Sequence, residues 1–459
     1  MLTRTNNMVI LAVMIILAGT SPAACENDPF FNARYEPPGG TVYHGVGWGD
    51  EAQVNYMSMF PGNLRPLLHQ SIFGIPGNTG RALTIRSILA RLAPPHMDAS
   101  RQVAEISVHF YENEMPVDSL FAYTGMYDQY MDTLARALIL HGEPVFLRIG
   151  LEMNGPWNGY TPWIFPAAFR KLTHGLRDRG VQNLATVWCY EPDAVADFAD
   201  STEQGWKWYP GNDMVDWFGL DLFDYDHFDP SLPDYGDRNA LTKKGRSGYF
   251  LQFALSRQKP VYLNELSARG VFITPEADDP DSADAMADWN TWFEPFFAFI
   301  ENHPVVKAFN YIDLEWTTIP QYSHWGDARL EINSYIRDRW TGRMADPRYL
   351  HIGTDPENPD TGVGTPEGLP TVPESMSLSA YPNPFNSRTC LELVMAQKQN
   401  VRMAVYNTAG RTVESRELGV LNTGIHRIVW DAGSLPSGVY MVRCAGSRMS
   451  VTGKLIMVR

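Results

Sequence analysis

The chain has 459 residues, of which 44% are hydrophobic and 12% aromatic, and it carries a formal net charge of −15 at pH 7. This length exceeds one ordinary domain and suits a large catalytic domain with a smaller second module. The acidic balance argues against nucleic acid as a ligand, because phosphate binding needs clustered positive charge. A neutral polysaccharide is compatible with this charge, and so is plain solubility.

Residues 1–25 have the features of an export signal. Arg4 supplies a basic start, an apolar run extends from Met8 to Ala18, and small residues precede Cys25. The apolar run is too short to span a bilayer comfortably. Cys25 leaves lipidation open as an alternative to ordinary cleavage. We therefore expect an exported chain that is secreted or held at the cell surface.

Strand-like and helical patterns alternate from residue 41 to about residue 345. Such alternation predicts parallel βαβ units, and eight strands are the number that closes a barrel. The sequence therefore predicts an α/β fold, a (β/α)8 TIM barrel over residues 26–350, with a doubly wound open sheet as the alternative. The predicted strands are 41–47, 67–73, 105–111, 144–152, 184–190, 216–223, 260–266 and 307–315, and helical patterns include 127–141, 166–179, 285–303 and 328–340.

The pattern changes beyond the barrel. Residues 351–376 are rich in Pro, Gly, Thr and acids, a composition that cannot bury a core and predicts a linker. Residues 377–459 alternate short strands with turns, which predicts a small all-β sandwich domain. Cys390 and Cys444 both fall in this module and could pair if their Cα atoms lie close enough. The predicted strands of the module are 391–395, 401–407, 426–430, 439–444 and 454–458.

The module also carries a signature of its own. The segments 381–386 (Tyr-Pro-Asn-Pro-Phe-Asn), 405–411, 435–440 and 454–459 resemble the C-terminal sorting domain of the type IX secretion system. The resemblance implies that this machinery is a partner, that the protein crosses the outer membrane, and that the domain is usually removed. A carbohydrate-binding sandwich is the alternative interpretation.

Two of the predicted barrel strands run into a glutamate at their C-terminal tips, Glu152 and Glu265. A carboxylate at the tip of a buried strand gains nothing from packing, and strand tips form the active-site face of such barrels. Retaining glycoside hydrolysis needs one carboxylic acid and one nucleophilic carboxylate about 5 to 5.5 Å apart. No His or Asp joins either glutamate at metal-ligand spacing along the chain, so no metal is predicted. No cofactor is predicted either, because glycoside hydrolysis by paired carboxylates needs none.

Strand periodicity adds a third charged residue to this pair. With a period of two, Arg148, Gly150 and Glu152 share one face of their strand. An inward Arg148 can order the carboxylate network and set its pKa, and Gly150 leaves room between the two charged side chains. A structural ion pair inside the barrel is the alternative.

Three motifs in order carry a resemblance to a known family. They are residues 148–157 (Arg-Ile-Gly-Leu-Glu-Met-Asn-Gly-Pro-Trp), 208–221 and 259–265, and they resemble family 26 glycoside hydrolases, which include many β-mannanases. The resemblance spans about residues 40 to 345. It implies a (β/α)8 barrel and a retaining mechanism, with Glu152 as general acid/base and Glu265 as nucleophile.

The same resemblance, together with strand position, suggests substrate-binding residues. His109 stands where the third strand of the family carries a substrate-contacting His, with a satisfied core His as the alternative. Asn154 and Trp157 follow the acid and are expected to line the site. Trp188 and Trp316, at the ends of the fifth and eighth strands, are predicted sugar platforms, with core packing as the alternative for both.

Two positions depart from the family pattern. Leu151 stands where the family commonly has His before the acid, and Phe223 stands where it commonly has a Tyr that steadies the nucleophile. Tyr225 could supply the missing hydroxyl from two residues further on. These departures leave the carboxylate pair intact but weaken the assignment to mannan.

The sequence as a whole predicts a secreted, monomeric, retaining endo-β-glycosidase that acts on plant-type β-glycans, with β-1,4-mannan as the leading substrate. A lichenase-like β-glucanase or a xylanase on the same barrel is one alternative. A non-catalytic polysaccharide-binding protein, which kept the cleft and lost turnover, is another.

Overall fold

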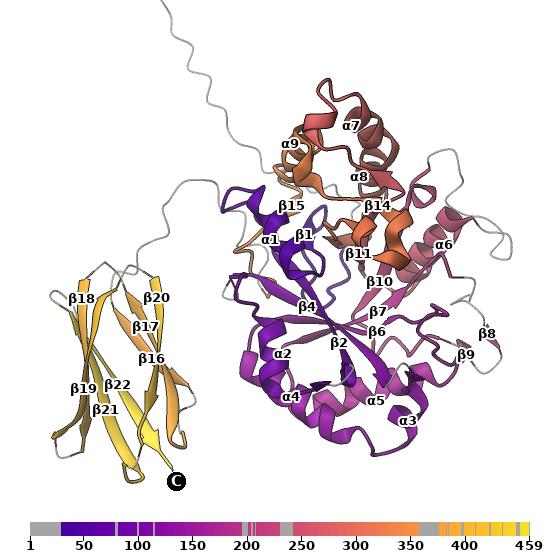
Figure 1. Cartoon of the computed structure of the whole chain (residues 1–459). Coiled ribbons are helices and arrows are strands. Elements are labelled where there is room, and N and C mark those ends of the chain that lie inside the picture. Colours follow the sequence, from indigo (N-terminus) through magenta and orange to yellow (C-terminus); the bar gives the residue numbers. More distant parts are fainter. Residues whose placement is uncertain are drawn as a thin grey trace, which may run out of the picture. The chain divides into compact units, whose positions relative to one another are not determined.

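Within residues 29–459 the computed structural model describes all but the gaps named below, and the chain forms two compact units, Met1–Val363 and Gly364–Arg459 (Figure 1). The predicted export signal lies outside the described residues. Residues 358–375, which hold most of the predicted linker, also lie outside the described residues. The predicted domain limits therefore stay predictions. The other gaps are 79–80, 99–100, 113–114, 195–200, 203–204, 207, 230–241, 382, 384, 396–398, 409, 422–423, 434, 447–449 and 459.

The first unit is a closed barrel of parallel strands. β1 pairs with both β13 and β2, so the sheet returns on itself, which confirms the predicted (β/α)8 barrel and excludes the open sheet. Each predicted strand overlaps one of the eight barrel strands. These are β1 (Val42–Val46), β2 (Leu68–Asn78), β4 (Val103–Glu112), β6 (Val145–Glu152), β7 (Leu184–Tyr190), β10 (Trp217–Asp224), β11 (Val261–Arg269) and β13 (Val306–Tyr311).

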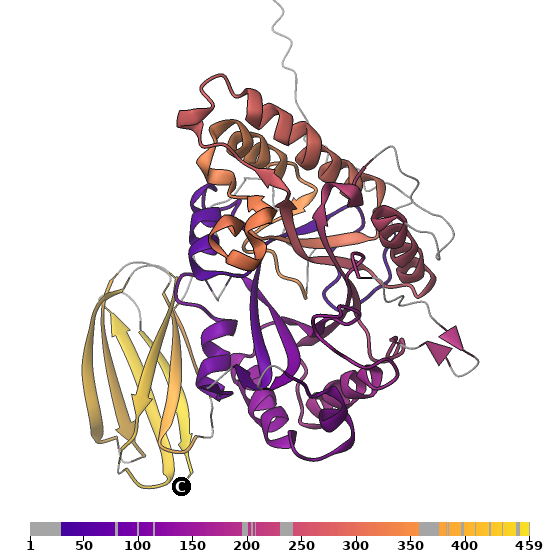
Figure 2. The same cartoon turned by 45° about the vertical axis from the view of Figure 1, so that its right-hand side comes forward.

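Helices surround the strands, with α2, α4 and α5 on one side of the barrel and α7, α8 and α9 on the opposite side (Figures 1 and 2). The helix predicted at 285–303 forms three consecutive pieces, α7, the π-helix η3 (Trp289–Phe293) and α8, and the one predicted at 328–340 begins later. Among the described residues no helix is both long and apolar enough to cross a bilayer. The helices are α1 (Asp50–Ser58), α2 (Ile85–Leu92), α3 (Asp118–Tyr123), α4 (Asp128–His141), α5 (Phe165–Asp178), α6 (Lys243–Ser256), α7 (Ala283–Asp288), α8 (Glu294–Asn302) and α9 (Ser334–Met344).

The barrel interior changes from apolar to polar along its axis. Large rings including Tyr43, Phe146 and Trp217 fill the N-terminal end, where the indole N–H of Trp217 donates to the Arg34 carbonyl. Polar side chains follow toward the C-terminal ends of the strands, among them Glu105, which is fully buried. Buried polar groups need partners, and their gathering at one end of the barrel marks the end where chemistry is expected.

The second unit consists of two antiparallel sheets that share one apolar core, as predicted for a sandwich. Cys444 is a buried free thiol in that core, so the suggested disulfide with Cys390 is not formed. β16 and β19 were not predicted, and β19 is mostly exposed, so it lacks the apolar alternation that marks a strand. The sheets are β16 (Ser377–Tyr381), β17 (Arg388–Met395) and β20 (Gly424–Asp431), and β19 (Thr412–Leu421), β18 (Gln399–Asn407), β21 (Gly438–Gly446) and β22 (Ser450–Met457).

Candidate active site

Four acidic residues come from the C-terminal parts of neighbouring barrel strands. Glu152 ends β6, Glu191 directly follows β7, Asp221 lies in β10 and Glu265 lies in β11. One oxygen atom each of Glu152, Glu191 and Asp221 lies within 4.8 Å of the other two. Because the strands are parallel, their C-terminal ends meet at one rim, which brings these residues together from distant parts of the chain.

The end of β6 departs from regular strand geometry. Gly150 has φ +84° and Leu151 has φ +48°. Arg148 pairs with Val187 of β7, whereas Glu152 already pairs with Cys189, so β6 contains two more residues than β7 over this stretch. Such a bulge breaks the alternation of side chains, and strained backbone of this kind gathers at functional sites.

The predicted role of Gly150 as a spacer between two charged side chains is therefore wrong. A Cβ atom at Gly150 would lie 2.2 Å from Cε2 of Phe165, on α5. Glycine is required here because the backbone is left-handed and because the ring of Phe165 packs directly against it.

Arg148 orders the predicted nucleophile rather than the predicted acid. Its side chain is fully buried and donates from Nη1 to Oε1 of Glu265 at 2.5 Å and from Nη2 to Oδ2 of Asp221. The other oxygen of Asp221 accepts from the backbone N–H of Glu265 at 2.9 Å. A guanidinium with two carboxylates forms a planar, charge-assisted network, which holds the Glu265 side chain in one orientation.

Glu152 has a different electrostatic environment. It is half-buried, and its Oε2 accepts from the indole N–H of Trp157, a ring that is 53% exposed. Burial and then the negative charge of Glu265 raise the pKa of Glu152 to about 7, while Arg148 and Trp157 act in the opposite direction. Two carboxyl groups with such different surroundings are typical of an acid and nucleophile pair.

Glu191 was not predicted as a site residue. It is 2% exposed, and burial followed by the charge of Glu152 raises its pKa well above the ordinary value. Asn154 holds its main chain by donating to the Glu191 carbonyl at 2.8 Å and accepting from the Glu191 N–H at 2.9 Å. Asn154 thus positions Glu191 instead of facing the cleft as predicted. The argument that singled out Glu152 also applies to Glu191, because Glu191 follows a predicted apolar strand.

The prediction of Trp188 as a sugar platform is wrong. Its ring is fully buried and packs against the rings of Tyr209, Phe218 and Phe250 at 5.0, 5.2 and 5.6 Å. Phe250 belongs to α6, so Trp188 lies on the outer, helix-facing side of β7. Its contribution is to the hydrophobic core.

Trp316 and Tyr225 also differ from expectation. Trp316 is 2% exposed and donates from its indole N–H to Oγ of Ser267 at 2.8 Å, so its ring is not an open platform. It packs edge-on against Trp48 at 5.7 Å. Tyr225 interacts through its hydroxyl with Asp229 and not with Glu265. Arg148 and Asp221 take the steadying role that had been suggested for Tyr225.

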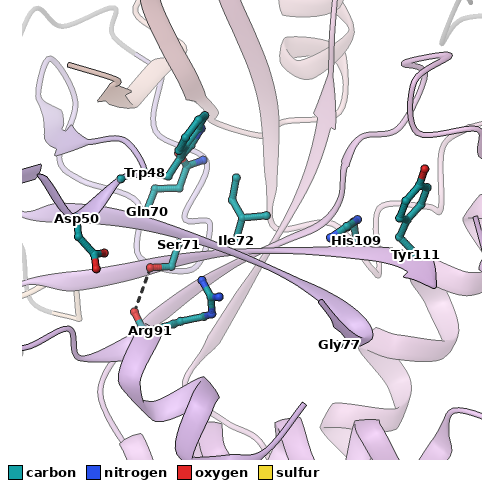
Figure 3. Close-up of a pocket in the computed structure, with 10 residues that line it drawn as sticks. Trp48, Asp50, Gln70, Ser71, Ile72, Gly77, Arg91, His109 and Tyr111 are labelled. Atoms are coloured by element: carbon teal, nitrogen blue, oxygen red, sulfur yellow. Dashed lines mark hydrogen bonds between the residues drawn. The ribbon is translucent and has the colours of Figure 1, made fainter. Parts of the chain in front are cut away.

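A cavity of about 590 Å³ is lined by residues of β2 and β4, by the segment after β1 and by Arg91 of α2 (Figure 3). His109 lines it, stacked on Tyr111 at 5.6 Å, and Trp48 lies toward the opposite end. Burial lowers the pKa of His109 to about 4, so its imidazole is neutral at pH 7. Gln70, also in the lining, donates to the Asn264 carbonyl at 3.2 Å. That contact connects the cavity to the residue before Glu265.

Spacing along the chain did not reveal that acidic groups gather here at metal-ligand distances. One such group is Glu152, Glu191 and Asp221, and Asp221 is already paired with Arg148. The other group is Glu191, Asp193 and His227. In it, Asp193 contacts three side chains at 2.9 to 3.1 Å, those of His227, Lys243 and Arg269. One acid of each group, Asp221 or Asp193, is already paired with a built-in cation, so we assign no metal to either group.

Comparison with known families supports the class of protein that this barrel and rim suggest. Residues 84–244 match Glycosyl hydrolase family 26, and residues 379–458 match the secretion system C-terminal sorting domain. Both resemblances predicted from the motifs are thereby confirmed. The first match supports glycosidase activity. The second indicates export by the type IX secretion system to the cell surface or the surrounding medium.

Individual relatives add detail. The chain is 30% identical over 243 residues to the β-1,3-xylanase TXYA of Vibrio sp, covering 49% of each sequence, and 28% identical over 250 residues to a β-1,3-xylanase of Alcaligenes sp, covering 50% of this chain and 49% of that one. The chain thus spans about half the length of the curated relatives it matches.

Similar solved structures include a Cellulomonas fimi endo-β-1,4-mannanase double mutant, with 16% identity, a TM-score of 0.46 and coverage of 94% of this chain and 98% of that chain. Another is a family 26 β-mannanase from Bacteroides ovatus, with 16% identity, a TM-score of 0.45 and coverage of 68% of this chain and 91% of that chain.

Proposed function

We propose that the protein is a secreted, retaining endo-β-glycosidase in which Glu152 is the general acid/base and Glu265 the nucleophile. The observation that carries this proposal is the contrast between the two carboxyl groups at one rim. Glu265 is ion-paired with Arg148, whereas burial and the charge of Glu265 raise the pKa of Glu152 to about 7. One group is thereby suited to attack and the other to carry a proton.

The two groups would act in two steps. In the first, Glu152 donates its proton to the glycosidic oxygen while the Glu265 carboxylate attacks the anomeric carbon and forms a glycosyl ester. Esterification removes the negative charge of Glu265, which is one cause of the raised pKa of Glu152. The pKa of Glu152 then falls, and its carboxylate can accept a proton from the water that hydrolyses the ester.

For the substrate we propose a β-linked glycan, with β-1,3-xylan first and β-1,4-mannan second. The two curated relatives described above are both β-1,3-xylanases, and this supports xylan over the mannan favoured by the sequence motifs. The departures at Leu151 and Phe223 from the pattern common among mannanases point the same way. The exposed ring of Trp157 beside Glu152 remains a predicted surface for sugar stacking.

The test is reducing-end release by the full chain from β-1,3-xylan, β-1,4-xylan, β-1,4-mannan, glucomannan and lichenan. We expect hydrolysis of at least one glycan, products that first appear as the β-anomer by proton NMR, and rates that fall as pH rises through about 7, when Glu152 loses its proton. Glu265→Ala should abolish turnover. Glu36→Gln is a matched control, because Glu36 is a buried carboxyl that accepts hydrogen bonds only from its own N-terminal segment among the described residues.

Three results would contradict the proposal. Binding of a glycan without hydrolysis would identify a non-catalytic polysaccharide-binding protein instead. Full activity of the Glu265→Ala variant would mean that the nucleophile is another residue. Inversion of the anomeric configuration would exclude the glycosyl ester.

A further inference from the structure

Glu191 is held in place by contacts that do not use its whole carboxyl group. Asn154 binds the N–H and the carbonyl of Glu191, and Oε1 of Glu191 accepts from the backbone N–H of Asp193 at 2.6 Å. Its Oε2 is buried and has no hydrogen-bond partner among the described residues. An oxygen of Glu152 lies within 4.8 Å of an oxygen of Glu191. A buried oxygen without a partner is costly, so its position beside the proposed acid calls for an explanation.

The charges around the pair show which protonation state fits. Three charged or titratable neighbours affect the pKa of Glu152: Arg148 on its own strand, Glu265 on β11 and Glu191 at the end of β7. Glu191 faces three negative groups, Glu152, Asp193 and Asp221, and the guanidinium of Arg148 is already bonded to Asp221 and Glu265. A ring nitrogen of His227 also lies within 4.8 Å of an oxygen of Glu191, but His227 is paired with Asp193 at 3.1 Å. Glu191 is buried and Glu152 half-buried, and neither is bonded to a cation among the described residues. Two adjacent carboxyl groups in these surroundings are not both ionised, so they hold at least one proton between them.

We propose that Glu191 is a positioning residue for the general acid/base, which keeps a proton on Oε2 and donates it in a hydrogen bond to the Glu152 carboxylate. This inference rests on the proposed function and deepens it. The donor stabilises the ionised form of Glu152, which is the base of the second step, against burial and against the charge of Glu265. Consistent with this, burial raises the pKa of Glu191 well above its ordinary value, and contact with Glu191 lowers the pKa of Glu152.

The first test compares Glu191→Gln and Glu191→Ala in the full chain, with Glu36→Gln as the control for loss of a buried carboxyl elsewhere. The readout is the pH profile of kcat/KM on whichever glycan the wild type hydrolyses. Glutamine keeps an N–H donor at the position of Oε2, so its alkaline limb should stay within about 0.3 pH units of the wild type. Alanine removes the donor, so its alkaline limb should move up by about one pH unit.

Two outcomes of this comparison would overturn the inference. An alkaline limb that moves down by a unit or more in Glu191→Gln would mean that Glu191 is ionised in the wild type, because the substitution would then remove a negative charge beside Glu152. An unchanged profile in Glu191→Ala would mean that the two carboxyl groups do not interact. A merely structural role of Glu191 would change folding yield without moving the profile.

A second test does not depend on activity. Titration of the wild type with ¹³C-labelled glutamate δ-carbons should show a carboxyl that is still protonated at pH 7 and whose signal is lost in Glu191→Gln but kept in Glu152→Gln. If hydrolysis is observed but this signal is absent, the inference about Glu191 is wrong while the proposed function stands. If no glycan is hydrolysed, the proposed function is wrong and the titration still decides where the proton lies. The titration and Glu191→Gln also suffice if the alanine variant does not fold.

Discussion

Replacing Arg148 with methionine is the most direct test of how the site is built. The substitution fills a similar volume but leaves Asp221 and Glu265 buried without their cation. Breaking a buried ion pair by removing one partner typically costs about 3–5 kcal/mol of unfolding free energy. We expect a loss in that range at pH 7 for Arg148→Met.

The same substitution should affect catalysis through the nucleophile. Without the guanidinium, the Glu265 side chain loses the cation that holds it in one orientation for attack on the anomeric carbon. If about 3–5 kcal/mol of this interaction is lost in the transition state, at 1.36 kcal/mol per tenfold change, kcat/KM should fall by about 10² to 10⁴. Arg148→Lys keeps the charge but cannot bond both carboxylates in one plane, so its loss should be smaller.

The assay combines guanidinium denaturation, followed by tryptophan fluorescence, with initial rates between pH 4 and pH 8. Arg148→Lys is the comparison in both measurements. An unfolding free energy of Arg148→Met within about 1 kcal/mol of the wild type, or a kcat/KM within threefold of the wild type, would refute the reasoning about Arg148.

Three further predictions concern residues around the site. Gly150→Ala should lose about 2–4 kcal/mol of stability in the same denaturation assay, because its backbone is left-handed and a Cβ would lie 2.2 Å from Phe165; an unaffected midpoint would contradict this. Trp188→Ala should lose about 3–5 kcal/mol of unfolding free energy but leave KM within about twofold of the wild type. A tenfold higher KM would mean that Trp188 contacts the substrate after all. Burial raises the pKa of Glu105 from 4.5 to about 8, so between these pH values the folded state keeps a proton that the unfolded state releases. The unfolding free energy of the wild type should therefore fall by up to about 5 kcal/mol as pH rises from 4.5 to 8. Glu105→Gln should lack this pH dependence, and parallel stability profiles of wild type and variant would contradict the prediction.

Much of the fold could be predicted because the strands of the barrel are buried on both faces and therefore stand out as apolar runs in the sequence. The eight apolar runs predicted their strands within a few residues, and the helical patterns between them predicted parallel connections. Prediction failed where both faces of a strand are apolar. Trp188 belongs to such a strand, and alternation alone does not say which of its two faces packs against helices.

The details of β6 could not be predicted for a different reason. A period of two assumes regular extended backbone, but Gly150 and Leu151 have left-handed φ values. The bulge breaks this period between Arg148 and Glu152, and Arg148 bonds the nucleophile of another strand. Gly150 within the strand pattern is a local sign of a bulge, but the register with β7 and the contact with Phe165 appear only in the tertiary structure.

The sequence by itself determined the two domains, the class of barrel and the two glutamates at the ends of strands, because each depends on residues close together in the chain. Only the tertiary structure decided that Arg148 pairs with Asp221 and Glu265, and that Glu191 lies beside Glu152. Those neighbours are brought together by closure of the barrel. Charge interactions fall off with distance in space, so the protonation states of the site depend on that closure and not on spacing along the chain.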